Sequence, residues 1–282
     1  MSVIAVFGGA NMDILGMPRD TMRLRDSNIG RVILRPGGVG RNVAEQIAVR
    51  GEACSLFTVF GNDPMADVLK RDCEQKGIEI SHALTAEGNT CVYLCLHDET
   101  GDMLAAVNDM ALTERLTPDY AERVLPEINQ ARLCVLDANP PVETVRYVAE
   151  HARIPLLMDA VSCAKLDRVR AVLPYLTALK PNLMEARMLT GKGAPQDCAR
   201  ALLELGVQRV FISLGAEGIC CADRDVCRIL PVKQPSDAPK TGAGDALCAG
   251  LAIALSQGEN TIKCAEYGMQ CAADYLQNRE VN

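Results

Sequence analysis

The chain has 282 residues, 49% of them hydrophobic and 23% charged, and its net charge at pH 7 is −7. This length suits one large α/β domain or two ordinary ones, and the acidic balance without a basic stripe disfavours nucleic acid as a partner. No run of 18 apolar residues occurs, and the short apolar N-terminal run lacks the preceding basic residues of a signal peptide, so we expect neither a membrane span nor a leader.

Short β-branched runs alternate with longer stretches of helical pattern along the chain. The runs predicted as buried strands are Val3–Phe7, Ser55–Phe60, Leu133–Leu136, Pro155–Met158 and Arg209–Ser213. The stretches predicted as helices are Asn42–Arg50, Met65–Lys76, Val142–His151, Pro195–Leu205, Ala246–Gln257 and Thr261–Leu276. This alternation predicts a mainly parallel sheet with helices on both faces.

Two segments interrupt the alternation. Ile14–Arg35 is polar and loop-like and ends in the strand-like RVILR, whereas Thr90–Val107 contains two strand-like runs around a Glu-Thr-Gly-Asp turn. We expect a single domain over residues 1–282, with the strands of a small flap inserted at about 14–35 and 89–108. An ordinary edge hairpin is the alternative that the pattern alone leaves open.

The 13 cysteines are scattered through apolar segments, with no CxxC pair, and the three histidines are isolated in the sequence. A zinc site or a disulfide framework is therefore not expected. Buried reduced thiols in a cytoplasmic protein fit this cysteine usage better.

Polar residues follow the first predicted strand in the sequence GGANMD. Ligands of parallel α/β sheets bind beyond the carboxyl ends of the strands. Asn11 and Asp13 are alternate residues at that point, so both can face one crevice and suit adjacent hydroxyls of a sugar. A simple Asx turn is the alternative.

A second glycine-rich motif, PGGVGRN at 36–42, precedes a predicted helix. Glycines such as Gly38 permit close approach of the backbone to a ligand, and Asn42 can both donate and accept hydrogen bonds. The motif does not fit GxGxxG with a later acidic residue, so we do not expect a dinucleotide-binding fold.

Two weaker motifs follow later strand-like runs, KPNLME at 180–185 and SLGAEG at 213–218. Asn182 and Glu185 share a helical face if a helix starts there, and Glu185 can hold magnesium through water. Ser213, Gly215 and Gly218 form a small-residue turn against which a nucleotide can lie. A helix cap and a β-turn are the alternatives.

The strongest local motif is KTGAGDA at 240–246, directly before a helical run. The backbone N–H groups of Gly242, Ala243 and Gly244, with the helix dipole, can stabilise the charge that develops on a transferring phosphoryl group. Asp245, in the first helical turn, can accept the proton of an attacking alcohol. A helix cap with glycines for close packing is the alternative.

These motifs in this order resemble the ribokinase-like (phosphofructokinase-B type) carbohydrate and nucleoside kinases over nearly the whole chain. The resemblance implies a ribokinase-like three-layer sandwich with a small β-strand lid, ATP and Mg2+ as cofactors, and a homodimer formed through the lid. It implies Asp245 as the base and Gly242–Gly244 as the anion hole. It assigns sugar contacts to Asn11, Asp13, Gly38 and Asn42, and the ATP and magnesium side to Asn182, Glu185, Ser213 and Gly215.

Within the family the chain is most similar to the pseudouridine kinases. The matching segments are Asp26-Ser27-Asn28 with Gly30, PGGVGRN, Asn89-Thr90, Asn108-Asp109-Met110, and Asp159-Ala160-Val161-Ser162 with Lys165. By this similarity Asn139 is expected to bind ribose, Asn108 is the first candidate for reading the base, and Lys165 is expected on the nucleotide side. The implied reaction is phosphorylation of the 5′-hydroxyl of pseudouridine. A kinase of ribose, another nucleoside or a hexose, and a ligand-binding regulator without catalysis, are the alternatives.

One departure from the family pattern concerns the residues before TGAGD. The family commonly has an Asp-Thr pair there, which helps to build a monovalent-cation site, whereas this chain has Pro239 and Lys240. We therefore expect little or no activation by potassium. Lys240 is expected to face solvent, although it can instead place a positive charge near the phosphates.

Overall fold

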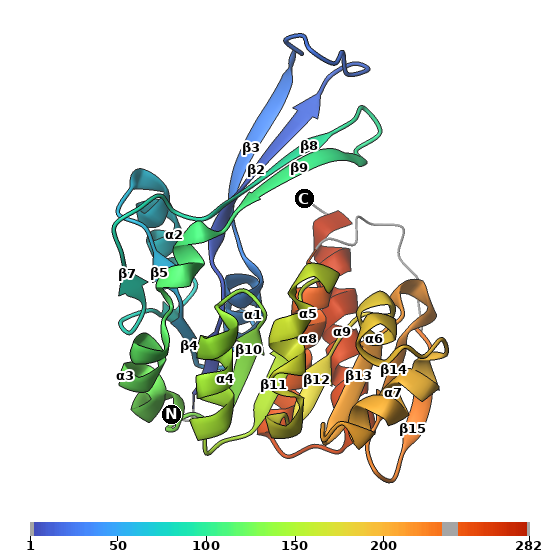
Figure 1. Cartoon of the computed structure of the whole chain (residues 1–282). Coiled ribbons are helices and arrows are strands. Elements are labelled where there is room, and N and C mark those ends of the chain that lie inside the picture. Colours follow the sequence, from blue (N-terminus) through green and yellow to red (C-terminus); the bar gives the residue numbers. More distant parts are fainter. Residues whose placement is uncertain (1–2, 233–241, 281–282) are drawn as a thin grey trace.

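The computed structural model describes residues 3–232 and 242–280. In this part of the chain nine strands form one large sheet in the order β15-β14-β13-β12-β11-β10-β1-β4-β6 (Figure 1). Neighbouring strands are parallel, except that β14 runs antiparallel between β13 and β15. The strands are β1 (Ile4–Phe7), β4 (Cys54–Phe57), β6 (Ile78–Glu79), β10 (Leu133–Asp137), β11 (Leu156–Asp159), β12 (Ala178–Lys180), β13 (Arg209–Ser213), β14 (Ile219–Ala222) and β15 (Cys227–Leu230).

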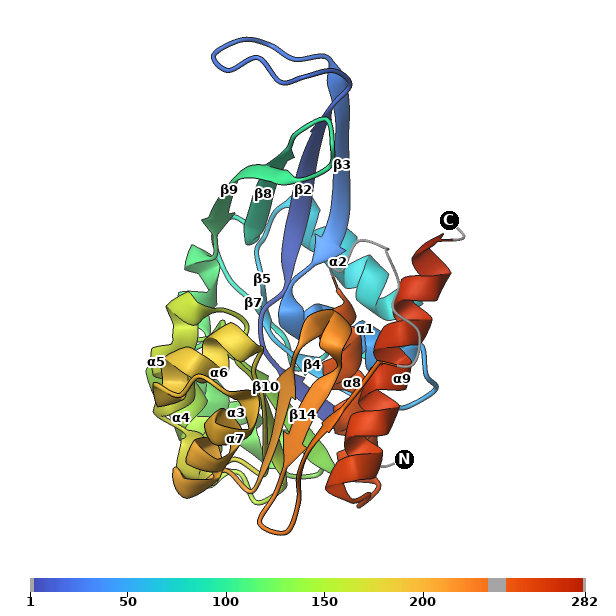
Figure 2. The same cartoon turned by 90° about the vertical axis from the view of Figure 1, so that its right-hand side faces the viewer.

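Helices cover both faces of the large sheet (Figure 2). One face carries α1 (Val39–Ala48), α2 (Pro64–Gln75), α8 (Ala243–Ser256) and α9 (Thr261–Glu280). The other carries α3 (Pro118–Ile128), α4 (Val142–His151), α5 (Leu166–Arg170), α6 (Leu183–Thr190) and α7 (Pro195–Glu204). Short 3-10 turns are η1 (Ala111–Arg115), η2 (Cys163–Lys165), η3 (Leu173–Tyr175) and η4 (Gly215–Glu217). The predicted three-layer α/β sandwich is confirmed.

The two cores follow from the period of two in a β-strand. In β1, Ala5 and Phe7 pack into the core under α3 and α4, whereas Ile4 and Val6 pack into the core under α1 and α8. Every residue of β1 is buried. A strand buried on both faces reads as a continuous apolar run, which is why these central strands are visible in the sequence.

One predicted strand is divided in the structure. The run Ser55–Phe60 was expected to be a single strand, but β4 ends at Phe57 and β5 (Val59–Phe60) pairs instead with β7 (Leu84–Thr85) in a two-stranded sheet. The backbone carbonyl of Thr58 accepts a hydrogen bond from the Leu84 N–H over 2.8 Å. A distant segment therefore sets the break, and the local apolar pattern cannot reveal it.

A second, four-stranded sheet projects above the large one (Figure 1). Its strands lie in the order β3-β2-β8-β9, with bounds β2 (Asn11–Pro18), β3 (Gly30–Gly37), β8 (Val92–His97) and β9 (Met103–Asp109). We call it the small sheet. The expectation that the chain is loop-like from Ile14 up to RVILR was wrong, because β2 continues to Pro18 and pairs with β3 on one side and β8 on the other. Pairing with two partner strands, one of them distant in the sequence, makes this segment a strand despite its glycine and proline.

Two further findings concern the environment of the chain. Among the described residues, no helix combines the length and apolarity needed to cross a membrane. All 13 cysteines are free thiols, and only Cys163 and Cys227 are more than slightly exposed.

Candidate active site

The two strongest glycine motifs each open a helix at the carboxyl end of the large sheet. Gly38 and Gly242 are the N-cap residues of α1 and α8 and have φ angles of 95° and 91°, which favour glycine. A Cβ on Gly38 would lie 2.6 Å from the Cα of Ala10, just after β1. The glycine therefore lets α1 begin against the end of β1, three residues earlier than the expected start at Asn42.

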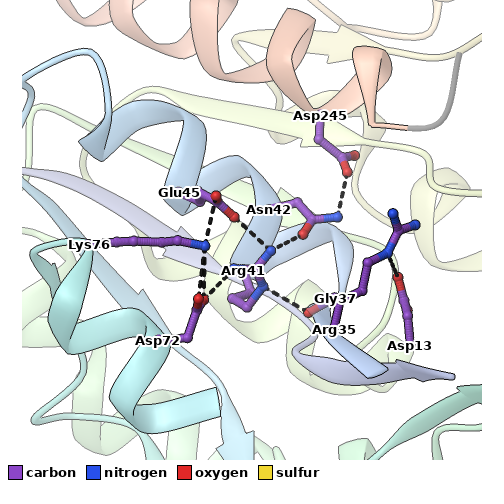
Figure 3. A network of polar contacts seen from close by, with 9 residues as sticks. All are labelled: Asp13, Arg35, Gly37, Arg41, Asn42, Glu45, Asp72, Lys76 and Asp245. Carbon is purple, nitrogen blue, oxygen red and sulfur yellow. Dashed lines mark hydrogen bonds and ion pairs between the residues drawn. The ribbon is translucent and has the colours of Figure 1, made fainter. Parts of the chain in front are cut away.

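Asp245 and Asn42 meet across these two helix starts (Figure 3). The Asn42 Nδ2 donates a hydrogen bond to Oδ2 of Asp245 over 2.8 Å. Burial, with the negative charge of Asp159 as a second cause, raises the pKa of Asp245 to about 7, and the Asn42 hydrogen bond opposes this rise. Because Asp245 is only half-buried, its carboxylate keeps access to a ligand. A carboxyl with a pKa near neutrality is suited to act as a general base.

Three charged residues form a row at the same edge of the sheet. Asp137, Asp159 and Lys180 end β10, β11 and β12 and are partners in register, so their side chains project from one face. Lys180 Nζ lies 2.9 Å from Oδ2 of Asp159, and both side chains are buried. Burial opposes the charge on Lys180, but the Asp159 carboxylate outweighs it and raises the pKa of Lys180.

Lys180 also lies beside the predicted anion hole. A Cβ added to Gly244 would come 3.8 Å from Lys180 Nζ, and no other described side chain would come within 4 Å apart from those of the neighbouring residues. The ammonium of Lys180 therefore lies close to the backbone at the start of α8. Negative charge at this point would be stabilised by the helix N-terminus and by Lys180 together.

Asn139 and Lys165 lie beside the end of β1. Oδ2 of Asp137 accepts hydrogen bonds from the Gly9 N–H at 2.8 Å and from Asn139 Nδ2 at 2.9 Å, and Lys165 Nζ donates to Oδ1 of Asn139. Burial lowers the pKa of Lys165 and raises that of Asp137. The structure therefore groups Lys165, which was expected on the nucleotide side, with the residues expected to bind the sugar.

Asn11 and Asp13 lie next to each other at the base of the small sheet. Asn11 Nδ2 donates to Oδ1 of Asp13 over 2.8 Å, and Arg35 Nε lies 3.4 Å from Oδ2 of Asp13. Asp13 is in register with Arg35 and Tyr93, and Tyr93 is in register with Asn108. The row Arg35–Asp13–Tyr93–Asn108 therefore crosses one face of the small sheet, and two of the residues expected to bind substrate belong to it.

Apart from Lys165, the residues expected on the nucleotide side lie at the ends of β12 and β13. Asn182 and Glu185 form a capping box at the start of α6, with hydrogen bonds of 2.9 and 2.8 Å. Ser213 forms a parallel bridge with Asn182. Gly215 begins the turn η4 and Gly218 follows it, with φ angles of 64° and 109°. Asn182 and Glu185 therefore form the helix cap that was the alternative to a ligand site. They still form one group with Ser213, Gly215 and Gly218.

Glu185 fits weak, water-mediated magnesium binding. Burial, with the negative charge of Asp159 as a further cause, raises the pKa of Glu185, while the Asn182 N–H and the positive charge of Lys180 oppose this rise. Among the described residues no group of three acidic, histidine or cysteine side chains forms a metal cage. Mg2+ keeps several waters and commonly uses one or two carboxylates with substrate phosphates, so this donor set is compatible with it.

Some of these residues were not identified from the sequence, and others cannot be placed. Asp137, Asp159 and Lys180 each follow an apolar strand directly, and a charged residue at that position was the signal that could have found them. Pro239 and Lys240, on which the potassium expectation rests, lie outside the described residues.

Comparison with known proteins gives a family and a fold for the chain. The model of the pfkB family carbohydrate kinases matches residues 1–282. A pseudouridine kinase of Escherichia coli (strain K12) is 32% identical over 279 residues, which cover 96% of this chain and 89% of the relative. A cytidine kinase of Thermococcus kodakarensis is 25% identical, covering 97% and 95% of the two chains. The solved ribokinase of Thermotoga maritima, 24% identical, has the same fold, with a TM-score of 0.89 over 98% of this chain and 93% of that one.

Proposed function

This chain belongs to the pfkB family of carbohydrate kinases, and we propose that it transfers the γ-phosphoryl group of ATP to the 5′-hydroxyl of pseudouridine. Transfer of a phosphoryl group to an alcohol is the chemistry of the family. The observation that carries the proposal is the position of Asp245, a half-buried carboxyl with a pKa of about 7 in the first turn of α8. Such a group can accept a proton at neutral pH beside a site for phosphate.

In the proposed reaction Asp245, as carboxylate, accepts the proton of the 5′-hydroxyl while the hydroxyl oxygen bonds to the γ-phosphorus. The bond from that phosphorus to the bridging oxygen breaks, and ADP leaves with the electron pair. The backbone N–H groups of Gly242–Gly244 and the ammonium of Lys180 stabilise the developing negative charge. Bound magnesium would supply further charge neutralisation between the phosphates, held through water by Glu185.

The two groups of polar residues define the orientation of the ligands. Asn11, Asp13, Gly38 and Asn139 lie around the end of β1, so we assign the sugar to that side. The group of Asn182, Glu185, Ser213, Gly215 and Gly218 lies along the sheet at the ends of β12 and β13, and we assign ATP to it. Asp245 at the start of α8 would then act between the two ligands.

Two observations favour a nucleoside over a free sugar. The most similar curated relative described above is a pseudouridine kinase, and the cytidine kinase matches almost the whole chain. The row that begins at Asp13 continues across the small sheet through Tyr93 to Asn108, which provides an aromatic ring and an amide beyond the sugar. Pseudouridine keeps an N1–H that uridine lacks, and an acceptor such as the Asn108 amide oxygen can recognise it.

Steady-state kinetics with a panel of acceptors tests this proposal. We expect kcat/KM with MgATP to be highest for pseudouridine and lower by up to ~10⁴-fold for uridine, because an acceptor covered by the bound nucleoside would be left without its donor. Cytidine, adenosine and ribose complete the panel. If one of these is used as well as pseudouridine, the substrate assignment fails and the kinase assignment stands. If none leads to ATP consumption, a ligand-binding regulator is the better description.

The small sheet is proposed as a lid that excludes water from this site. Its outer face, opposite Asp13, carries the row Leu34–Ile14–Leu94–Val107, of which Leu34 and Val107 are 54% and 64% exposed. Exposed apolar sheet faces are unfavourable in a monomer, so we propose that a second copy of the chain covers it. Thirteen free thiols fit a reducing compartment, and we propose the cytoplasm.

Sedimentation tests the proposed homodimer. Leu34→Glu combined with Val107→Glu should give a monomer, because two carboxylates would be buried without partners. Leu205→Glu, at an exposed apolar residue after α7, is the matched control and should leave the dimer intact. A wild-type chain that sediments as a monomer at micromolar concentration would refute this assembly.

A further inference from the structure

The start of α1 contains a buried arginine that no step of the proposed reaction uses. The side chain of Arg41 is 3% exposed, and its guanidinium lies 2.8 Å from a carboxylate oxygen of Glu45 and 2.8 Å from one of Asp72. Its Nε donates to the carbonyl oxygen of Gly37 over 3.1 Å. Lys76 lies within 2.9 Å of both carboxylates, so the cluster has two positive and two negative charges (Figure 3).

The remaining contact of Arg41 points toward the proposed base. Arg41 Nη2 donates a hydrogen bond to Oδ1 of Asn42, and the opposite end of the same amide, Nδ2, donates to Asp245. We propose that Arg41 is a positioning residue that acts on Asp245 through Asn42. This inference rests on the proposed function of Asp245 as the base.

The argument depends on the two unlike ends of an amide. An amide oxygen accepts and an amide nitrogen donates, so a guanidinium on one side determines which end faces the other side. If the Asn42 amide flipped, its Nδ2 would face the Arg41 donors and its Oδ1 would face the Asp245 carboxylate. Both contacts would be repulsive. Arg41 therefore holds Asn42 in the orientation in which it donates to Asp245.

Lysine cannot replace arginine in this role. The guanidinium has five N–H donors in a planar fork, and at Arg41 these reach two carboxylates, a carbonyl and the Asn42 amide at once. A single ammonium at this position would be drawn to Glu45 and Asp72, because they carry full charges. Arg41→Lys therefore preserves the charge balance of the cluster and removes the constraint on Asn42.

The consequence appears in the titration of Asp245. The hydrogen bond from Asn42 stabilises the charged carboxylate and lowers the pKa of Asp245 against the effect of burial. When Asn42 is free to turn, that stabilisation weakens and the pKa of Asp245 increases. The acid limb of the kcat/KM profile should move to higher pH by up to about one unit.

The experiment compares Arg41→Lys with Lys76→Met. Both variants alter the cation contacts of Glu45 and Asp72, but Lys76 makes no contact with Asn42 among the contacts that the structure records. We expect the acid limb to shift in Arg41→Lys and to stay in place in Lys76→Met. In an Asn42→Ala background, Arg41→Lys should change kcat/KM less than about twofold, because the residue through which it acts is gone.

A second measurement does not depend on the substrate. The ¹³C signal of the Asp245 carboxyl, assigned by comparison with Asp245→Asn, is titrated in the free protein by NMR. Its midpoint should rise in Arg41→Lys and in Asn42→Ala and stay unchanged in Lys76→Met. If Arg41→Lys does not fold, the double variant Arg41→Gln, Asp72→Asn takes its place in the comparison with Lys76→Met. It removes one positive and one negative charge, so the net charge of the cluster does not change.

The outcomes separate the two proposals. An unchanged midpoint and acid limb in folded Arg41→Lys, or an equal loss of kcat/KM with and without Asn42, overturns the role of Arg41. A wild-type enzyme that phosphorylates none of the acceptors overturns the proposed function, whereas the NMR titration still shows whether Arg41 controls the Asp245 carboxyl.

Discussion

Asn42 Nδ2 and Asp245 Oδ2 are joined by a hydrogen bond of 2.8 Å between residues 203 positions apart in the sequence. Each residue lies near the start of a helix that begins with a positive-φ glycine. The bond therefore connects the two glycine motifs of the chain directly. It also means that a group expected to contact the sugar influences the protonation of the proposed base.

Replacement of Asp245 by asparagine tests the base. Asp245→Asn is nearly isosteric but cannot accept the proton, so we expect kcat to fall by ~10²–10⁴ with an unchanged circular dichroism spectrum. Asp167→Asn is the matched control, since Asp167 is 94% exposed on α5 and should tolerate the change. Turnover near the wild-type value in Asp245→Asn would rule out this residue as the base.

The pH dependence of the reaction should follow the same carboxyl. Burial raises the pKa of Asp245 to about 7, and only the carboxylate can accept the proton of the alcohol. We therefore expect kcat/KM to increase with pH through the neutral range and to level off above it. Initial rates at fixed ionic strength measure this profile. A flat profile across that range would contradict the assignment.

The pKa of Asp245 also predicts how stability depends on pH. An unfolded aspartate has a pKa of about 3.9, so between about pH 4 and pH 7 the native state retains a proton that the unfolded state has released. The contribution of this residue to the free energy of unfolding is therefore lost as the pH rises through that window. The free energy of unfolding decreases by at most about 1.4 kcal/mol per pH unit from this cause.

Urea denaturation of wild type and Asp245→Asn at several pH values measures this effect. The variant lacks the carboxyl, so its stability relative to wild type should increase between pH 4 and pH 7 and stay constant above. The raised pKa of Glu185 affects both proteins alike, so its contribution cancels in the difference. A stability difference that does not vary with pH would show that the pKa of Asp245 is not raised.

The buried pair of Lys180 and Asp159 should be required for stability and for rate. Lys180→Met leaves the Asp159 carboxylate buried without its partner, which typically costs about 3–5 kcal/mol. It also removes a positive charge that lowers the pKa of Asp245, so the acid limb should move to higher pH. Urea denaturation and the kcat/KM profile measure the two effects.

The double variant Asp159→Asn with Lys180→Met is the control for that prediction. It removes both charges of the buried pair, so it should recover much of the lost stability. Its kcat should stay low, because the ammonium beside Gly244 is still missing. Equal activity of the double variant and wild type would exclude Lys180 from stabilisation of the transferring group.

Calorimetry should separate the two ligand sides. Asp13→Ala removes a carboxylate at the base of the small sheet, and we expect it to weaken nucleoside binding about tenfold or more, with little effect on ATP. Glu185→Gln, at the start of α6, should have the opposite preference and act mainly on MgATP binding. Equal effects of either variant on both ligands would contradict this division.

Much of the fold could be predicted because its signals are local. Buried strands such as β1 and β10 are continuous apolar runs, and helices such as α1, α2 and α4 show their own periodicity, whereas α3, α5 and α6 were not identified. The motifs around Asn42 and Asp245 could also be identified, because glycines before a helix have a direct physical use. The start of α1 was predicted at Asn42, but the helix begins at Val39. The low helix propensity of glycine favoured the later start, and the close packing of Gly38 on Ala10 overrides it.

The sequence by itself determined the sandwich, the presence of a helix after each glycine motif and the identity of the proposed base. Only the tertiary structure decided which distant residues touch. Register across three parallel strands brings Asp137, Asp159 and Lys180 into one row, and the approach of α1 to α8 joins Asn42 to Asp245. Local propensity is encoded over a few residues, whereas the pKa of a carboxyl depends on burial and on charges that arrive from far along the chain.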